Sequence, residues 1–251
     1  MTATLTEIRR HPVKALGAET LARAELREGK PIAFDRRWAI AHSGAGSPDA
    51  DGWMAPRNFV TQKHVPALAA VTAAFEEATG QLALAHPDRP PLTVRPDAPD
   101  DARALTDWIG PLADAVRPGP YRLLTRADGA MTDDPDAGIH IGSTATLRAV
   151  SEAAGHPLSR ARFRANLWVD GWAPYEEFDL VGRRVRIGGA LLEIIERTGR
   201  CAATMANPST GRRDIDLPAV IQRYWGHTDF GVYARVVEGD TLAPGDPVSV
   251  A

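Results

Sequence analysis

The sequence contains one cysteine, Cys201, among its 251 residues, and this scarcity excludes several kinds of protein. One cysteine cannot close an intramolecular disulfide, and iron–sulfur clusters of the ordinary types need several thiolates. The seven histidines are too scattered for a two-histidine helical zinc site, and no second cysteine can complete a thiolate zinc site. We therefore expect no disulfide scaffold, no ordinary zinc site and no electron relay within this chain.

Long hydrophobic runs and a surplus of basic charge are also missing. No uninterrupted apolar stretch approaches the roughly 18 residues of a membrane-spanning helix, and the first residues lack the apolar core of a secretory signal. The formal net charge is −3, with arginines scattered among acidic residues, which argues against an extended contact with a phosphate backbone. We predict a cytoplasmic protein that binds neither membranes nor nucleic acids.

Three common motifs are absent as well: the G-x-G-x-x-G dinucleotide fingerprint, the G-x-x-x-x-G-K-[ST] phosphate loop and the G-x-S-x-G nucleophile elbow. The adjacent glycines Gly188 and Gly189 follow Val185 and Ile187, which alternate with arginine. This pattern is typical of a hairpin turn between two strands. Nucleotide binding therefore has no local support.

What is present predicts a globular protein built mainly of strands. The composition is 44% hydrophobic, enough for a sizeable core, and short alternating runs bounded by glycine, proline or polar residues indicate strands. Three segments carry helix patterns instead: residues 101–110, 143–155 and 216–225. Ser143 and Asp216 are the predicted N-caps, and Gly155 ends the second helix. Residues 67–88 fit either an alanine-rich helix or a hairpin, and we favour the hairpin.

Residues 86–101 concentrate proline and aspartate, which rarely continue a helix or a central strand. The composition predicts a connector, and we place a domain boundary there. We expect a strand-rich domain over residues 1–100 and a second domain over residues 101–251. Near the end, residues 230–239 and 242–250 predict a pair of strands joined by a Pro-Gly turn.

Three roles are open for Cys201: packing in the core, attacking a substrate or binding a metal. Free cysteines are often buried. However, Arg197 and Arg200 precede Cys201 closely, and Arg212 and Arg213 follow it. Nearby positive charge would lower the pKa of the thiol and favour the thiolate, which a nucleophile and a soft metal ligand both require. A cysteine hydrolase would also need a histidine base, which the sequence does not identify.

Several stretches together resemble the MOSC family, the domain related to the C-terminal part of molybdenum cofactor sulfurases, and its two-part relatives such as the mitochondrial amidoxime-reducing component. The similar stretches are residues 11–17, 34–40, 59–68, 162–171, 181–201, 205–211, 230–236 and 245–250. They follow the family order over nearly the whole chain, and the Arg200-Cys201 pair is the most specific. The resemblance implies an α+β, mainly β fold: a MOSC β-barrel domain, a smaller strand-rich N-terminal domain, and the cofactor between them.

The resemblance also implies the site residues. Cys201 matches the catalytic cysteine that ligates molybdenum in the molybdenum cofactor (Mo-molybdopterin). Other positions match residues that bind the cofactor: Lys14, Arg36, Ser143, Arg164, Asn166 and Arg200. Ser143 also fits an ordinary N-cap, and any single arginine also fits a solvated strand position. The chain departs from the pattern at Ala15 and Gly199, where relatives often carry serine.

The activity that the resemblance implies is that of a molybdenum-cofactor-dependent oxidoreductase. It would reduce N-oxygenated substrates such as hydroxylamines, amidoximes or N-hydroxylated bases, with electrons from an external protein of ferredoxin, flavoprotein or cytochrome type. The alternative is a non-catalytic carrier of the cofactor, or of sulfur on Cys201; a third is a member dedicated to one nitrogen–oxygen substrate in a biosynthetic pathway. Glu176 and Glu177 either deliver protons or are simply solvated loop charges.

Overall fold

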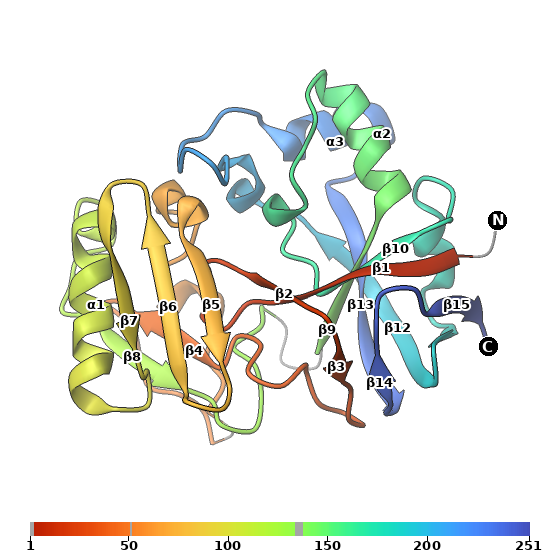
Figure 1. Cartoon of the computed structure of the whole chain (residues 1–251). Coiled ribbons are helices and arrows are strands. Elements are labelled where there is room, and N and C mark those ends of the chain that lie inside the picture. Colours follow the sequence, from red (N-terminus) through yellow and green to blue (C-terminus); the bar gives the residue numbers. More distant parts are fainter. Residues whose placement is uncertain (1–2, 51, 134–137) are drawn as a thin grey trace.

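The computed structural model describes residues 3–50, 52–133 and 138–251, which form two adjoining parts (Figure 1). The larger part, on the right in Figure 1, contains the main sheet. Its strands are β1 (Ala3–Arg10), β2 (Glu19–Leu21), β9 (Ile139–Ser143), β10 (Leu167–Asp170), β11 (Arg184–Ile187), β12 (Ala190–Gly199), β13 (Asp229–Glu238) and β15 (Pro247–Val250). The strand order is β10-β9-β13-β12-β11-β15-β1, and β1 also pairs with β10, which closes a barrel; β2 lies beside β1. The predicted mainly β fold with a barrel is confirmed.

The smaller part, on the left in Figure 1, has a core of its own. Its elements are β4 (Trp38–Ala41), β5 (Thr72–Glu76), β6 (Gln81–His86), β7 (Arg89–Val94), α1 (Pro99–Ala113) and β8 (Arg122–Thr125). β5, β6 and β7 form one antiparallel sheet, and β4 pairs with β8. Along β5, Ala73 and Phe75 are buried, while Thr72, Ala74 and Glu76 are exposed. This two-residue period belongs to a strand. The hairpin predicted over residues 67–88 is confirmed for residues 72–86, whereas residues 67–70 belong to a 3₁₀ helix (Pro66–Ala70).

The predicted connector over residues 86–101 is wrong. β7 runs through it and pairs with β6 at the edge of the three-stranded sheet. An edge strand tolerates Pro90 and Pro91 because one side of its backbone has no neighbour that needs N–H donors. Composition alone cannot separate such a strand from a connector. The domain boundary at residue 100 stays a prediction; α1, which spans it, contributes Leu105 and Ile109 to the core of the smaller part.

Two helices, α2 (Thr144–Ala154) and α3 (Leu217–Trp225), pack together beside the barrel at the top of Figure 1. The hydroxyl oxygen of Ser143 accepts the Thr146 N–H, and the carboxylate of Asp216 accepts the Ala219 N–H. Gly155 ends α2 with a φ of 67°, a left-handed value that glycine adopts at little cost. The predicted caps and the helix end are confirmed.

The predicted pairing of the last two strands is wrong. β13 already has β12 on one side and β9 on the other, so no edge is left for the following segment. After β13, β14 (Thr241–Leu242) pairs with β3 (Ala24–Glu25), and β15 pairs with β11 and β1. The hairpin predicted around Gly188 and Gly189 is confirmed, since β11 and β12 pair on either side of it.

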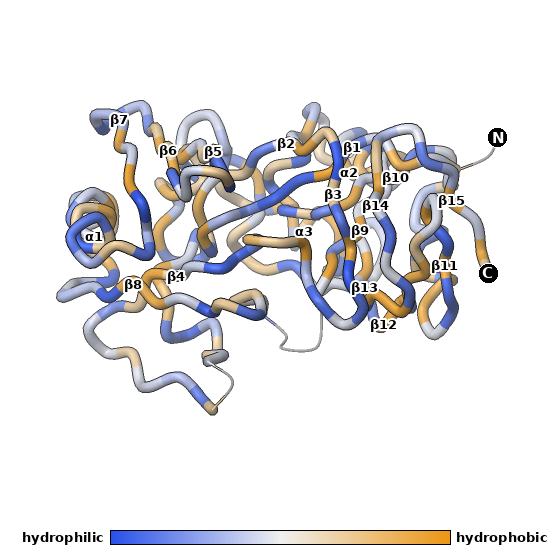
Figure 2. The backbone as a smooth tube through the Cα atoms, turned by 60° about the horizontal axis from the view of Figure 1, so that its bottom comes forward, coloured by the Kyte–Doolittle hydropathy of each residue, from blue (hydrophilic) through white to orange (hydrophobic). Residues whose placement is uncertain are grey.

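Apolar residues are divided between the two parts rather than gathered in one run. Figure 2 shows hydrophobic segments in strands of both. One core fills the barrel, and another lies between α1 and the strands of the smaller part. Within the described ranges, none of the helices has the length and hydropathy required to cross a bilayer.

The two parts meet closely at Gly17. A β-carbon at this position would lie 2.5 Å from the Val71 carbonyl oxygen and 2.5 Å from the Ala73 nitrogen. We therefore expect Gly17→Ala to lower the free energy of unfolding by about 1–3 kcal/mol, because the backbone has to move. Urea denaturation measures this. Gly46→Ala is the matched control, since the nearest atom to its added β-carbon lies 4.0 Å away; equal losses in both variants would contradict the packing argument.

Candidate functional site

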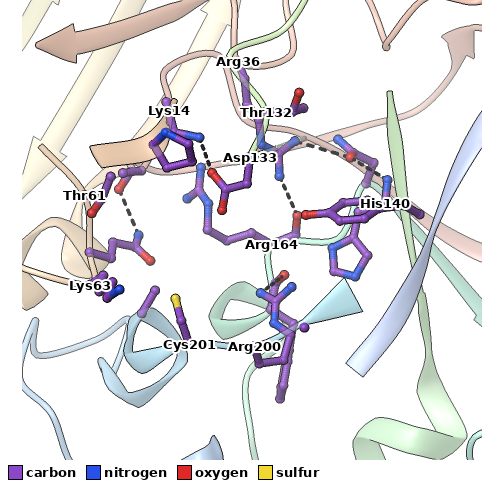
Figure 3. Close-up of a pocket in the computed structure, with 18 of the residues that line it drawn as sticks. Lys14, Arg36, Thr61, Lys63, Thr132, Asp133, His140, Arg164, Arg200 and Cys201 are labelled. Carbon is purple, nitrogen blue, oxygen red and sulfur yellow. Dashed lines mark hydrogen bonds and ion pairs between the residues drawn. The ribbon is translucent and has the colours of Figure 1, made fainter. Parts of the chain in front are cut away.

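A pocket lies where the end of β12 faces the segments that follow β1 and precede β4 (Figure 3). Six of the seven predicted site residues line it: Lys14, Arg36, Arg164, Asn166, Arg200 and Cys201. They come from both parts of the molecule and lie far apart in the sequence. Ser143 does not line the pocket; it is fully buried, and its hydroxyl caps α2. The structure thus shows the capping role that the sequence allowed for Ser143.

Cys201 lies two residues after the end of β12, where the chain leaves the barrel. Its carbonyl oxygen accepts the Thr204 N–H at 3.1 Å and the Thr204 hydroxyl at 3.0 Å, which fixes the turn into a short 3₁₀ helix (Ala202–Met205). Cys201 is exposed, and its sulfur points into the pocket (Figure 3). The thiol therefore does not pack in the core, and it is accessible to a ligand.

Arg200 lines the pocket next to Cys201. Its Nη2 donates to the Phe163 carbonyl oxygen at 2.8 Å, and its guanidinium lies 6.0 Å from the centre of the Phe163 ring. Its buried Nε has no hydrogen-bond partner among the described residues. Burial lowers the pKa of Arg200. By contrast, Arg197 lies over the Phe178 ring in a different groove.

Arg36 forms hydrogen bonds with residues on the barrel side of the pocket. Its Nη2 donates to the Arg164 carbonyl oxygen at 2.9 Å, and its Nη1 donates to Asn166 Oδ1 at 3.3 Å. The same Asn166 oxygen accepts the His140 N–H at 3.1 Å. Arg36 also pairs with the buried carboxylate of Asp35. Although burial alone would raise the pKa of Asp35, Arg36 and His11 hold it well below its ordinary value, so the ion pair is fixed.

The backbone around the pocket is strained. Ala15, Arg36 and Arg164 line it and have positive φ values of 65°, 49° and 54°. Non-glycine residues rarely adopt this region, which costs on the order of 1–3 kcal/mol each. Only two further non-glycine residues among those described share it, Phe34 and Tyr175. Strain of this kind collects at sites where geometry matters more than stability, which makes this pocket the candidate functional site.

The charge of the pocket is predominantly positive. Buried Lys14 donates to the Met131 carbonyl oxygen at 2.7 Å and pairs with Asp133. Burial lowers the pKa of Lys14, and Asp133 partly offsets this effect. Burial and Arg36 lower the pKa of Arg164 to about 9, which leaves it protonated at neutral pH. Together with Arg36 and Arg200, these cations outnumber the lining carboxylate, so the pocket suits an anion.

Sequence reasoning missed several lining residues. They are Gln62, Lys63, Asp133, His140 and Tyr233. Gln62 and Lys63 lie within residues 59–68, one of the stretches that resemble the family. That resemblance is the sequence feature that could have identified them as pocket residues. Tyr233 lies in another such stretch, residues 230–236, whereas His140 occupies an ordinary position in β9 and nothing local distinguishes it. Burial, Arg200 and Arg36 hold the pKa of His140 well below its ordinary value, so its ring is neutral.

Glu177 is not a solvated loop charge, and it does not line the pocket. It is fully buried, its Oε2 accepts the Thr146 hydroxyl at 2.9 Å, and its buried Oε1 has no hydrogen-bond partner in the described part of the chain. Burial raises the pKa of Glu177 to about 7. Its neighbour Glu176 is exposed, as the solvated interpretation predicts.

Comparisons with known proteins match both parts of the chain. Residues 2–113 match the MOSC N-terminal beta barrel domain, and residues 128–249 match the MOSC domain. A molybdenum cofactor sulfurase from Drosophila grimshawi is 33% identical over 95 residues, which cover 36% of this chain and 12% of that protein. The chain thus spans a small fraction of that relative.

Solved structures are also similar. The YUAD protein from Bacillus subtilis is 13% identical with a TM-score of 0.49, covering 100% of this chain and 96% of that one. YiiM from Geobacillus stearothermophilus is 22% identical with a TM-score of 0.37, covering 46% of this chain and 54% of that one. The two domain matches together extend over nearly the whole sequence. The chain therefore belongs to the MOSC domain family, in a two-part arrangement in which a MOSC N-terminal beta barrel domain precedes a MOSC domain.

Proposed function

We propose that this protein is a molybdenum-cofactor-dependent oxidoreductase that reduces N-oxygenated substrates with electrons from a separate protein. The observation that carries the proposal is the placement of an exposed thiol, Cys201, in a strained and cationic pocket between the two parts. Membership of the MOSC family and the similarity to a molybdenum cofactor sulfurase support the choice of cofactor. The resemblance to the two-part reductases supports the reaction.

The residues of the pocket fit this cofactor, which carries a phosphate and a polar pterin. Arg164 Nη2 and Arg200 Nε are buried and lack hydrogen-bond partners among the described residues. Buried donors without acceptors are costly, and guanidinium groups bind phosphate and planar polar edges well. In the described ranges no group of three His, Cys, Asp or Glu side chains is placed to hold a metal ion. Cys201 would be the protein ligand, and the cofactor itself would provide the remaining donors.

When bound, the cofactor would supply the two-electron chemistry that removes oxygen from nitrogen. The protein's residues would position it. The Cys201 thiolate would donate to the metal, since a thiolate is a soft, strong ligand. Lys14, Arg36, Arg164 and Arg200 would hold the anionic groups, and Asn166 would keep Arg36 oriented through its Oδ1. Outer groups of this kind set ligand orientation.

The test begins with the wild-type protein made in cells that synthesise the cofactor. We expect near-stoichiometric molybdenum and pterin, measured by metal analysis and pterin fluorescence. Hydroxylamine, and an amidoxime as a second substrate, should oxidise a reduced viologen dye in the presence of the protein. Bound molybdenum without any dye oxidation would identify a carrier instead. Absence of molybdenum and pterin, even after reconstitution, would contradict the cofactor assignment.

A further inference from the structure

A second cavity lies behind one wall of the Cys201 pocket. Its volume is about 120 Å³, and its polar lining includes Arg9, His11 and Arg164. Gln62 and Arg164 line both this cavity and the Cys201 pocket. Lys14, Arg36 and Arg200 line the pocket but not the cavity. The two spaces are therefore neighbours that share Arg164, while Arg9 lines only the cavity.

Unpartnered nitrogen atoms face this region. His11 is 0% exposed, and neither ring nitrogen has a hydrogen-bond partner among the described residues. The Arg9 side chain is 19% exposed, and its Nη1 is likewise buried without a hydrogen-bond partner among the described residues, while its Nε pairs with Glu7. Buried polar groups are normally satisfied by protein or ordered water. A ligand with oxygen acceptors in the adjoining cavity would satisfy these donors.

The carboxylates nearby are already shared with other cations. Glu7 lies 3.1 Å from Arg9 Nε, but it also pairs with Arg160 at 2.6 Å. Asp35 lies 3.4 Å from His11 Nδ1, but it also pairs with Arg36. Burial, Arg164 and Arg36 hold the pKa of His11 well below its ordinary value, so the imidazole is neutral. Two guanidinium groups thus give the cavity a positive charge that the protein does not balance.

The size of the cavity suits a small ligand. A water molecule needs about 10–15 Å³ of such space, so about 120 Å³ holds several waters or one tetrahedral oxyanion. Guanidinium groups bind phosphate oxygens through paired, charge-assisted hydrogen bonds. A neutral imidazole can add a donor or an acceptor, which suits the protonated oxygens of phosphate near neutral pH.

We propose that this cavity binds one oxyanion of the phosphate class, held between the guanidinium groups of Arg9 and Arg164 with His11 as a third polar contact. The oxyanion is either free phosphate or the phosphate of a larger ligand that extends through the wall shared with the Cys201 pocket. Phosphate binding itself requires no molybdenum, so the proposal goes beyond the proposed reductase activity; only the second source rests on the proposed function.

The experiment is calorimetric titration of inorganic phosphate into protein made in cells that lack cofactor synthesis. Arg9→Gln removes a charge that lines the cavity alone, and Lys14→Gln removes one that lines the Cys201 pocket alone. Arg27→Gln is the matched surface control, since Arg27 is 71% exposed and pairs with Glu25. We expect saturable binding that Arg9→Gln weakens about tenfold or more. At this site Lys14→Gln and Arg27→Gln should leave the affinity unchanged.

Repeating the titration on cofactor-loaded protein separates the two sources. If phosphate still binds to cofactor-loaded protein, and Arg9→Gln weakens this binding, the site holds a free oxyanion. If cofactor loading abolishes phosphate binding, and Arg9→Gln also weakens cofactor retention, the site holds the phosphate of the larger ligand. The proposal is overturned if phosphate does not bind, or if Lys14→Gln weakens binding while Arg9→Gln does not. Should Arg9→Gln fail to fold, Ala161→Asp places a negative charge beside the cavity and should weaken phosphate binding similarly. Molybdenum content does not enter this titration, so either proposal can fail without the other.

Discussion

Replacing Cys201 with alanine should remove molybdenum from the protein and lower the rate of hydroxylamine reduction by more than about 100-fold. Substitutions of groups that only support a metal ligand already cost roughly 10–100-fold, and here the ligand itself is lost. The pocket lining includes no second cysteine that could replace it. Metal analysis by mass spectrometry and the dye-coupled assay, on wild type and variant prepared side by side, measure both effects.

The fold should survive this change, because Cys201 is exposed. Exposed substitutions usually alter stability by no more than about 0.5 kcal/mol. Ser209→Ala is the matched control: Ser209 is exposed in the loop that follows the same 3₁₀ helix, and its loss should leave molybdenum content and activity unchanged. Cys201→Ser tests the donor atom, since a hydroxyl is a harder and weaker donor than a thiolate. A Cys201→Ala protein that keeps its molybdenum and its activity would show that the ligand assignment is wrong.

Local features of the fold could be predicted from the sequence because their causes are local. The capping side chain of Ser143, the left-handed Gly155 and the turn at Gly188 each depend on a few neighbouring residues. The errors concern long-range pairing. β7 tolerates its prolines only because it lies at an edge, and β13 cannot pair with the segment after it because β9 and β12 flank it. The local sequence of a strand does not specify which strands lie beside it.

The same distinction holds for the site. The family resemblance identified Lys14, Arg36, Arg164 and Arg200 one by one, yet their convergence on one pocket depends on how the two parts meet. The lack of hydrogen bonds at the His11 ring nitrogens could not be predicted, since it results from burial in the folded chain. The burial of Glu177 could not be predicted either, because its neighbour Glu176 is exposed in the same short segment. Adjacent residues of one type can therefore differ completely in burial.

Replacing Glu177 with glutamine should stabilise the protein by about 3 kcal/mol at pH 8 and by little at pH 5. Burial raises the pKa of this carboxyl from 4.5 to about 7, and each pKa unit corresponds to about 1.4 kcal/mol. Between these two pKa values the folded protein binds more protons at Glu177 than the unfolded chain does, so stability falls as the pH rises through this window. Glutamine keeps an oxygen for the Thr146 hydroxyl and has no proton to lose. Urea denaturation at pH 5 and pH 8 gives the difference.

The comparison has to be made between variant and wild type, because buried His11 and His140 change the pH profile in the opposite direction. Their pKa values lie well below the ordinary 6.5, so they add stability as the pH rises through the unfolded value. This contribution is common to both proteins and cancels in the difference. Glu152→Gln is the control, since Glu152 is exposed on α2 and is not among the groups that shift the pKa of Glu177; its loss should leave the difference in stability between pH 5 and pH 8 as in wild type. If wild type and Glu177→Gln lose or gain stability in parallel from pH 5 to pH 8, Glu177 is not the buried carboxyl that titrates near neutral pH.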